Sequence, residues 1–382
     1  MTGVRCYILP PYITEHLGLS VATRAADIRA ARVEAALAAA TPTTDPLDRV
    51  GLYDAQQLTA LPGVPTTLSD SDAARVDAAL NATLDTYHEL AQTFGQAGVT
   101  ASVHFDMLYD NAYWNGTQMV FGDGDGTLFG SFTSCPDIAG HELTHGLTGA
   151  RLDYNGQSGA LNESMSDCLG ALVRQRLLNL SPADSDSWLI GKGLLLEAGA
   201  RALRDMLHPG TAYSTSQLGV DPQPADMSGY VQTTQDNGGV HLNNGIPNRA
   251  FALTAQALVS TEKAAAMWLS ALDRVGPAAQ FADFAAATVT LCPESLVPWQ
   301  TVGVLPVTTA PAPPPIPTPP PVPAPAPIPT PPPVPAPAPA PLPTVDQTFI
   351  IELRKLLARK VWMAPRKFRI AAQAWLDSHP SV

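Results

Sequence analysis

The first half of the chain combines short alternating stretches with one longer helical stretch. Apolar and polar residues alternate over 100–109 and 118–121, and this period of two predicts β-strands. A glycine-rich segment at 122–126 follows the second strand and predicts a turn. Residues 71–94 carry apolar positions at helical spacing, which predicts one helix among the strands.

The second half shows helical periodicity almost throughout. We predict helices over residues 136–148, 159–177, 188–206, 246–260, 262–274 and 278–290. Strands first and helices after favour an α+β fold with a β-rich N-terminal lobe and a mainly α-helical C-terminal lobe. The helix at 136–148 would then lie between the two lobes, where a cleft is expected.

Changes in composition divide the chain into five regions. The predicted regions are an N-terminal segment, 1–48; an N-terminal lobe, 49–150; a helical C-terminal lobe, 151–304; a proline-rich linker, 305–345; and a basic helical tail, 346–382. The first region holds a Pro-Pro pair and a helical stretch at 21–40, and a turn-rich break at 41–46 ends it. This arrangement suits a removable segment, and a plain N-terminal subdomain is the alternative.

The linker and the tail have distinct physical characters. Prolines at the density of 305–345 forbid helix and sheet and favour polyproline II, with an internal repeat of twelve residues. At about 3.1 Å per residue such a linker could span on the order of 120 Å, so we interpret it as a spacer rather than a ligand for a polyproline-binding partner. The tail has apolar residues at helical spacing and seven Arg/Lys against three acidic residues, a balance of +4. It could bind a membrane surface or an acidic partner, or it could form a small helical hairpin with a solvated face.

Charge, cysteines and hydropathy exclude several classes of protein. The net charge of −12 argues against a nucleic-acid enzyme, which would carry a basic surface. The four cysteines are widely spaced and predict no disulfide framework. They are interpreted as buried thiols, although Cys6 could act as a thiolate ligand for a metal. The sequence shows neither a membrane-spanning apolar run nor a secretory signal, so we expect synthesis in the cytoplasm, with secretion only by a non-standard route.

The strongest chemical pattern is His141-Glu142-Leu-Thr-His145 with Glu163 downstream. Residues four apart share a helix face, so His141 and His145 can direct two imidazoles at one point. Glu163 can supply a third ligand from the next predicted helix and leave the fourth tetrahedral position to water. Two such histidines with an adjacent glutamate are typical of a zinc peptidase site, in which Glu142 is the general base. The short pattern also occurs by chance on helices, but the Asn-Glu pair downstream favours the zinc site.

Several motifs in order make residues 50–304 resemble the thermolysin family of metallopeptidases. The motifs that carry the resemblance lie at 111–116, 119–126, 140–146, 159–167 and 236–246. The resemblance implies a two-lobed fold with the zinc helix between the lobes. It also implies one catalytic zinc ion bound by His141, His145 and Glu163.

The resemblance assigns roles to further residues. Tyr154 and His241 match the family's two donors to the developing oxyanion. Asp236 would orient His241, and Asp167 would accept a hydrogen bond from the ligand His141. The stretch between His141's helix and Tyr154 is shorter than in thermolysin, so the position of Tyr154 is an open question.

The resemblance also implies how a peptide substrate is bound. Arg204 would bind a substrate carbonyl, while Asn111 and the backbone of Ala112 would pair with the peptide main chain. An apolar S1′ pocket predicts cleavage before Leu, Phe, Ile or Val. Its walls would be Phe129, Phe132, Ile138, Ile190 and Leu203.

The N-terminal segment is similar to the short pro-segment of the protealysin-like branch of this family. Pro10, Pro11 and Tyr12 would lie across the cleft and inhibit the enzyme. A Pro-Pro peptide is extended and loses little entropy on binding. We expect autocatalytic removal of the pro-segment between about residues 41 and 51.

The acidic residues with which thermolysin binds two calcium ions are largely replaced. Asp137 keeps one position, but Arg174 and Lys192 stand where two glutamates would be, and Ser187 and Leu189 replace further acids. Calcium needs several carboxylate oxygens, so we expect little or no structural calcium.

These observations predict a monomeric zinc endopeptidase that is made as a self-inhibited precursor and acts on proteins or peptides. Glu142 would take a proton from the water at the zinc ion and pass it to the leaving amine. The alternative is a catalytically latent peptidase-like scaffold that acts as a binding protein through its tail. Another class of zinc peptidase is disfavoured, because Thr148 and Arg151 occupy positions where the metzincin pattern needs glycine and histidine.

Overall fold

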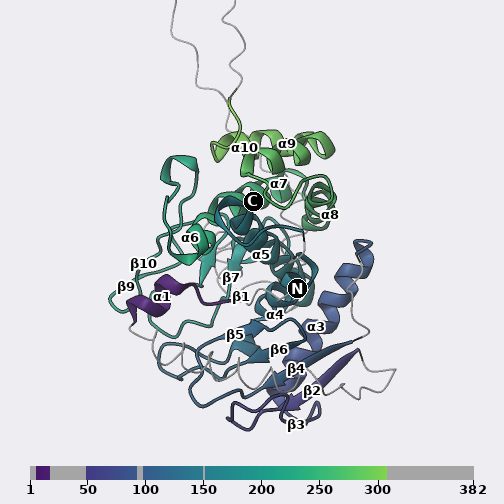
Figure 1. The fold of residues 1–382 in the computed structure, drawn as a ribbon, viewed down its shortest axis with the longest axis vertical. Coiled ribbons are helices and arrows are strands. Elements are labelled where there is room, and N and C mark those ends of the chain that lie inside the picture. Colours follow the sequence, from purple (N-terminus) through teal and green to yellow (C-terminus); the bar gives the residue numbers. More distant parts are fainter. Residues whose placement is uncertain (1–5, 18–48, 93–97, 149–150, 308–382) are drawn as a thin grey trace, which may run out of the picture. The chain divides into compact units, whose positions relative to one another are not determined.

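The protein is described here by a computed structural model. The described residues form four stretches, 6–17, 49–92, 98–148 and 151–307 (Figure 1). The chain divides into two compact units, Met1–Ala310 and Pro311–Val382, and every described residue lies in the first. The helix predicted at 21–40, the linker beyond residue 307 and the tail at 346–382 lie outside the described residues.

The N-terminal lobe is built on a six-stranded sheet. The neighbouring strands in order are β1 (Cys6–Tyr7), β5 (Ala112–Trp114), β6 (Gln118–Phe121), β4 (Val99–Val103), β2 (Val50–Asp54) and β3 (Val64–Pro65). β2, β4 and β6 are parallel, whereas β1 pairs antiparallel with β5, β5 with β6, and β3 with β2. The edge next to β5 is therefore closed by a strand from the N-terminal segment.

One helix of this lobe, α3 (Ser71–Glu89), packs on β2 and β4. Asp70 caps it by accepting hydrogen bonds from backbone N–H groups of the first turn, which would otherwise lack partners. Val76, Leu80 and Tyr87 lie on its buried face. The helix ends a few residues before the predicted position 94.

The strand predicted over 100–109 is wrong in its second half. β4 ends at Val103, and the chain then turns through His104, Asp106 and Leu108, whose φ angles are 54°, 52° and 53°. A strand cannot continue through left-handed backbone, so β4 stops at Val103. The alternation of apolar and polar residues in the sequence continues beyond that point.

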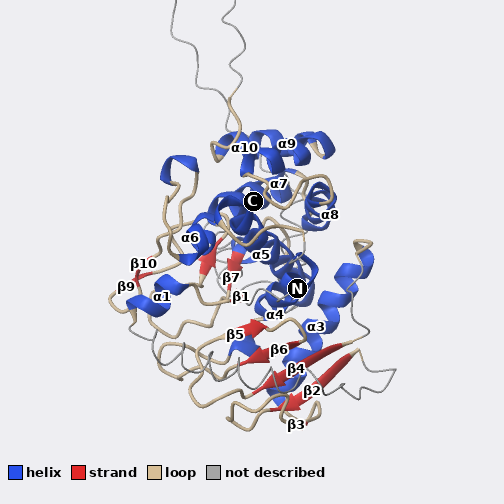
Figure 2. Ribbon diagram, in the orientation of Figure 1, coloured by secondary structure: helices blue, strands red, loops and turns tan. Residues whose placement is uncertain are grey.

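The C-terminal lobe is mainly helical. Its helices and the zinc-motif helix are α4 (Pro136–Thr148), α5 (Gly156–Leu178), α6 (Asp236–Asn243), α7 (Gly245–Ala257), α8 (Thr261–Leu272), α9 (Phe281–Leu291) and α10 (Leu296–Thr301). Figure 2 shows the sheet in the lower part of the view and α7 to α10 in the upper part, with α4 and α5 between them. This is the predicted α+β arrangement. Among the described helices, none is both long and apolar enough to span a bilayer.

The helix predicted over 188–206 is wrong. The segment begins with a 3-10 turn, Ser185–Trp188, and continues as two short antiparallel strands, β7 (Leu189–Ile190) and β8 (Arg204–Asp205). Glycines between the strands adopt φ angles of 67°, 90° and 94°, which are incompatible with a helix. The buried residues Leu189, Leu194 and Leu203 give this segment its apolar spacing, although several residues between them are exposed.

Two glycines allow α4 and α5 to pack closely. A Cβ atom on Gly170 would lie 2.5 Å from the carbonyl oxygen of Asp137, and one on Gly140 would lie 3.0 Å from the Cα of Gly170. Only glycine fits at such a crossing, because the neighbouring atoms are backbone and cannot move aside. The close approach brings the histidines of α4 to the glutamate of α5.

Candidate active site

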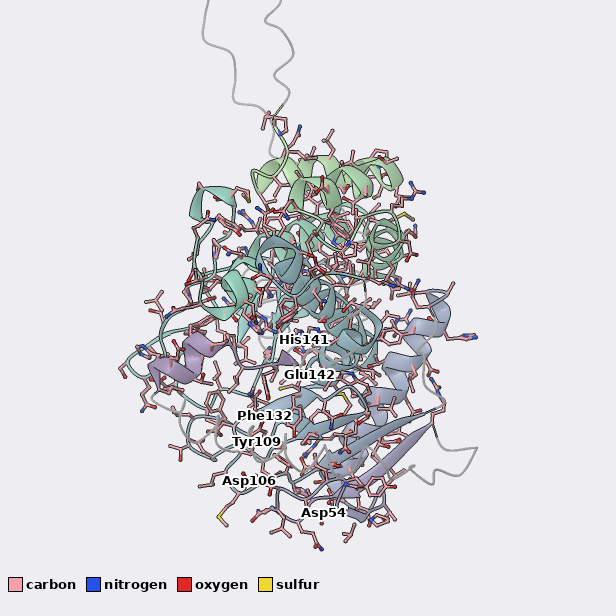
Figure 3. All side chains as sticks on the ribbon, viewed as in Figure 1. Asp54, Asp106, Tyr109, Phe132, His141 and Glu142 are labelled. Atoms are coloured by element: carbon pink, nitrogen blue, oxygen red, sulfur yellow. The ribbon has the colours of Figure 1, made fainter. Side chains whose placement is uncertain are left out.

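Three side chains of α4 and α5 meet in the interior between the lobes. One ligand atom each from His141, His145 and Glu163 lies within 4.8 Å of the others, and all three residues are buried. In Figure 3, His141 and Glu142 lie between the helices above and the strands below. The three predicted ligands are therefore close enough to hold one metal ion.

The outer nitrogen of each imidazole is held by a hydrogen bond. His141 Nδ1 lies 2.8 Å from Asp167 Oδ1, and His145 Nδ1 lies 3.0 Å from Asn162 Oδ1. With Nδ1 protonated, each ring presents a lone pair at Nε2, and the two Nε2 atoms lie 3.1 Å apart. Two imidazoles and one carboxylate with fixed tautomers fit a tetrahedral zinc site with one open position.

Burial and neighbouring charges shift the pKa values of the two histidines in opposite directions. Burial lowers the pKa of His145 to about 4, which favours the neutral form that binds metal. Burial acts on His141 in the same direction, but its bonds to Asp167 and Glu163 outweigh this and raise its pKa to about 9.

Glu142 lies beside the ligands but does not join them. Its Oε2 accepts a hydrogen bond of 3.2 Å from the backbone N–H of Trp114, and its Oε1 has no hydrogen-bond partner among the described residues. Burial raises the pKa of Glu142 to about 8. A carboxyl group with a pKa near neutrality can both take up and release a proton.

His241 reaches the ligand cluster from α6. Its Nδ1 lies 2.7 Å from Asp236 Oδ1, and its Nε2 lies 3.4 Å from Glu163 Oε2. Burial would lower the pKa of His241, but the carboxylates of Glu163 and Asp236 raise it to about 8. Gly238 and Gly239, with φ angles of 86° and 77°, turn the chain so that Asp236 can return to the imidazole.

Tyr154 also reaches the cluster, despite the shortened connection before it. Its hydroxyl donates a short hydrogen bond to Glu163 Oε1, and its ring packs edge-on against that of His145. The geometry places this hydroxyl at the metal ligands.

Asp167 joins the metal ligands to the predicted substrate arginine. The guanidinium group of Arg204 donates two hydrogen bonds to its carboxylate, of 2.8 and 2.7 Å. Burial acts in the opposite direction, but Arg204 and His141 hold the pKa of Asp167 well below its usual value. Asn244 and Asn248 also donate to Asp167 Oδ2, at 3.0 and 2.8 Å.

The roles of Asn162, Asn244 and Asn248 were not predicted from the sequence. Asn162 stands in the Asn-Glu pair that marked the third ligand, so that pair offered a signal for it. Asn244 and Asn248 are four apart, but this spacing alone does not identify a partner. Their role depends on α7 packing against α5.

The N-terminal segment occupies the predicted substrate site. The backbone N–H of Ile8 donates to the carbonyl of Ala112 at 3.3 Å, and that of Leu9 donates to Asn111 Oδ1 at 3.2 Å. Arg204 donates to the carbonyl of Ile8 at 3.2 Å. Three groups predicted to bind a peptide main chain are thus all engaged by this segment.

The predicted pocket residues are fully buried, and they belong to the same apolar cluster as Ile8. These residues are Phe129, Phe132, Ile138, Ile190 and Leu203.

The Pro-Pro pair continues from this strand into a short helix, α1 (Pro11–His16). Pro10 precedes the helix with extended backbone, and Pro11 occupies its first turn, where a missing N–H costs nothing. Tyr12 is enclosed near Tyr213, and burial raises the pKa of its hydroxyl well above the usual value.

Comparisons with known proteins agree with this geometry. Residues 50–149 match the thermolysin metallopeptidase catalytic domain, and residues 150–297 match the thermolysin metallopeptidase alpha-helical domain. An extracellular metalloprotease of Pectobacterium carotovorum subsp. carotovorum is 40% identical over 336 residues, which cover 78% of this chain and 96% of that protein. The chain belongs to the thermolysin family of metallopeptidases.

Two further relatives place the chain within the thermolysin family. Thermolysin of Alicyclobacillus acidocaldarius subsp. acidocaldarius is 38% identical over 222 residues, 53% of this chain and 38% of that protein. The solved structure of the protealysin precursor from Serratia proteamaculans matches with a TM-score of 0.69 and 38% identity. The match covers 78% of this chain and 100% of that one. The predicted fold and the predicted protealysin-like branch are confirmed.

Asp137, Arg174 and Lys192, the residues considered for the calcium prediction, bond to other groups of the chain. Asp137 Oδ2 accepts a hydrogen bond of 2.5 Å from the backbone N–H of Gly191. Burial raises the pKa of Asp137, and Arg174 opposes this shift. Arg174 donates to the carbonyl of Asp186, whose carboxylate pairs with Lys192.

None of the cysteines whose side chains the structure describes belongs to the candidate metal cluster. Cys135, Cys168 and Cys292 are free and buried. The side chain of Cys6 lies outside what the structure describes, so its predicted role as a metal ligand stays a prediction.

Proposed function

We propose that this metallopeptidase cleaves peptide bonds on the N-terminal side of bulky apolar residues, with Glu142 as the general base. One observation carries the proposal. Three candidate metal ligands and an adjacent carboxyl group lie beside the segment Cys6–Leu9, which pairs with β5 through Cys6 and Tyr7 and bonds to Ala112 and Asn111 through Ile8 and Leu9.

We assign the metal site to His141, His145 and Glu163. Zinc held there would lower the pKa of a water molecule toward neutrality and polarise the substrate carbonyl. Asp167 and Asn162 keep the two imidazoles in the tautomer that presents Nε2.

Glu142 moves the proton. It takes a proton from the attacking water and delivers it to the nitrogen of the leaving amine. Its raised pKa suits both steps, and its Oε1 is available for the water. The bond from the Trp114 N–H fixes the other oxygen and therefore the orientation of the carboxyl group.

His241 and Tyr154 stabilise the oxyanion. Both side chains reach Glu163, so their donors lie where negative charge develops on the substrate carbonyl. Asp236 holds His241 through both the imidazole and the backbone N–H and favours its charged form.

Substrate selection follows from the groups that now hold Ile8. Arg204, Asn111 and Ala112 bind the main chain, and the apolar pocket accepts the side chain after the cut. Because Asp167 binds the Nε and Nη2 edge of the Arg204 guanidinium group, Nη1 can donate to a peptide carbonyl in a defined position.

We propose that residues 1–48 form the inhibitory pro-segment and that the enzyme removes it between about residues 41 and 51. Pro10, Pro11 and Tyr12 anchor this segment across the cleft. The catalytic lobes would span 49–150 and 151–304, and the linker at 305–345 would separate them from the tail at 346–382. We propose that the tail docks to a membrane surface or an acidic partner. We also propose that the enzyme acts as a monomer and that it is exported, and the extracellular relative supports the export.

We further propose that the enzyme needs no structural calcium. Asp137, the one acid retained from the calcium pair, lies beside Arg174, and the cation of Lys192 also repels calcium.

Replacement of Glu142 by Gln tests the assignment. Glu142→Gln removes the proton acceptor with little change in volume, so casein hydrolysis and self-processing should both be lost while zinc remains bound. Glu294→Gln, an exposed carboxylate on the far part of the C-terminal lobe, is the matched control. Casein hydrolysis measured together with zinc content checks the prediction, and near-normal hydrolysis by the Glu142 variant would contradict it.

A further inference from the structure

We propose that the pro-segment is bound as a substrate, with the peptide bond between Tyr7 and Ile8 in the cleavable position. The enzyme cuts this bond slowly and retains the product, so the first cut leaves the enzyme inhibited. The inference rests on the proposed function and adds a cleavage site far from the expected processing region at 41–51.

Main-chain hydrogen bonds define the register. Cys6 pairs with Trp114 and Tyr7 with Tyr113, so the segment runs antiparallel to the edge strand. The N–H of Ile8 donates to Ala112, and its carbonyl accepts from Arg204. Both polar groups of one residue are thus bound, and a shift by one residue would break both bonds and turn the side chain to the other face.

Side-chain burial agrees with this register. Ile8 is fully buried in the cluster that contains the predicted pocket residues Phe129, Ile138 and Leu203. Leu9 is 2% exposed and follows in the next subsite. Tyr7 is only half-buried, and its ring packs against Tyr113 at a centroid distance of 5.5 Å. Ile8 is therefore the first residue after the cleavable bond.

The same register brings the reacting groups to the bond. Trp114, which pairs with Cys6, donates its N–H to Glu142, and the zinc-motif helix α4 contacts β1. Tyr7 lies between Cys6, which pairs with Trp114, and Ile8, which bonds to Ala112 and Arg204. The bond that joins Tyr7 to Ile8 thus lies between the general base and the pocket.

Hydrolysis of the bond between Tyr7 and Ile8 consumes one water molecule. The water oxygen bonds to the carbonyl carbon of Tyr7, and the C–N bond breaks with its electron pair on the nitrogen of Ile8. Glu142 carries one proton of the water to that nitrogen, and the second proton also ends there. The products are a carboxylate on Tyr7 and an ammonium group on Ile8.

The part after the cut remains joined to the enzyme. Ile8, Leu9 and α1 stay covalently linked to the catalytic lobes through residues 18–48, so their effective concentration at the cleft remains high. The bonds to Arg204 and Asn111 do not depend on residues 1–7. Pro10 and Pro11 restrict the chain and reduce the entropy lost on rebinding. The cut product is consequently an inhibitor until the second cut releases it.

Mass spectrometry of the full-length protein during maturation tests the proposal. We expect a species that begins at Ile8 to accumulate before the mature enzyme, without a parallel rise in casein hydrolysis. Ile8→Asp should eliminate this species, because a carboxylate does not fit the apolar pocket. Glu15→Gln, an exposed change in α1, should leave it unchanged.

The outcomes separate this inference from the proposed function. Casein hydrolysis without any species that begins at Ile8 would overturn the inference alone. Absence of casein hydrolysis would overturn the proposed function. Accumulation of the Ile8 species with full casein hydrolysis would also overturn the inference, because the product would not be retained.

Amide hydrogen exchange gives a readout that is independent of catalysis. In protein treated with a zinc chelator, the amides of Ile8 and Leu9 should both exchange slowly. Asn111→Ala should speed exchange of the Leu9 amide about tenfold more than that of Ile8, whose acceptor is a backbone carbonyl. Unprotected exchange at Ile8 would overturn the register.

Discussion

Tyr154 shows how a residue's role depends on side chains far from it in the sequence. The shortened segment before it left its position open, and in the structure its hydroxyl donates to Glu163, a proposed metal ligand. An oxyanion donor should act in the transition state more than in substrate binding.

Tyr154→Phe removes only this hydroxyl. We expect kcat to fall by about 100-fold with little change in KM, as for other single oxyanion donors. Steady-state kinetics on a peptide substrate measure both constants. A change confined to KM would show that Tyr154 binds substrate rather than the oxyanion.

Asp110 is a second residue whose behaviour is set by its surroundings. It is 8% exposed, its Oδ1 has no hydrogen-bond partner among the described residues, and burial followed by the charge of Asp125 raises its pKa to about 7. An unfolded aspartate has a pKa of about 4. The folded state therefore binds this proton more tightly, and stability from this group declines as pH rises from about 4 to 7.

Asp110→Asn removes the titration while keeping the shape. The variant should have a higher Tm than the wild type at pH 8, and the difference should vanish near pH 4, where both side chains are neutral. Thermal unfolding at several pH values measures this. A Tm difference that does not depend on pH would contradict the assignment to Asp110.

At the scale of elements, the crossing of α4 and α5 decides whether the ligands meet. The sequence predicts His141 and His145 on one face of a first helix and Glu163 on a second helix. The distance between the two helices depends on Gly140 and Gly170. These glycines have no chemical role of their own.

Gly170→Ala should force the two helices apart, because its Cβ would lie 2.5 Å from a backbone carbonyl. We expect a lower Tm and weaker zinc retention during dialysis. Gly276→Ala is the control, since a Cβ there meets no atom within 4 Å. Normal zinc retention by the Gly170 variant would show that the helices can adapt.

At the scale of the whole molecule, one hydrogen bond and one ion pair link α5 to the segments on either side of β7. Arg174 of α5 donates to the carbonyl of Asp186, and the carboxylate of Asp186 pairs with Lys192. We therefore expect the thermal stability of the protein to depend on these contacts rather than on bound calcium.

Calcium removal should have little effect on this protein. Dialysis against EGTA followed by return of zinc alone should leave the Tm equal to that of protein given zinc and calcium, whereas removal of zinc by 1,10-phenanthroline should abolish casein hydrolysis. Differential scanning calorimetry and activity assays measure the two effects. A Tm that falls with EGTA and recovers with calcium would contradict the prediction.

Sequence alone determined the chemistry and most of the elements. The pattern of His141, Glu142, His145 and Glu163 identifies a metal site because ligand type and helical spacing are local properties. The helix at 136–148 was predicted at its observed bounds, and the helix at 262–274 was predicted to within two residues. The segment at 188–206 was wrongly predicted as a helix because its buried leucines have helical spacing, whereas its glycines with positive φ angles form turns.

Only the tertiary structure decided which distant groups act together. The hydrogen bonds of Asp167 to His141, Arg204, Asn244 and Asn248 depend on packing between helices and the strand β8, which lie far apart in the sequence. The register of Ile8 on the edge strand likewise depends on contacts across more than half of the described chain. Spacing within one helix follows from its geometry, whereas contacts between elements follow from which surfaces bury best together.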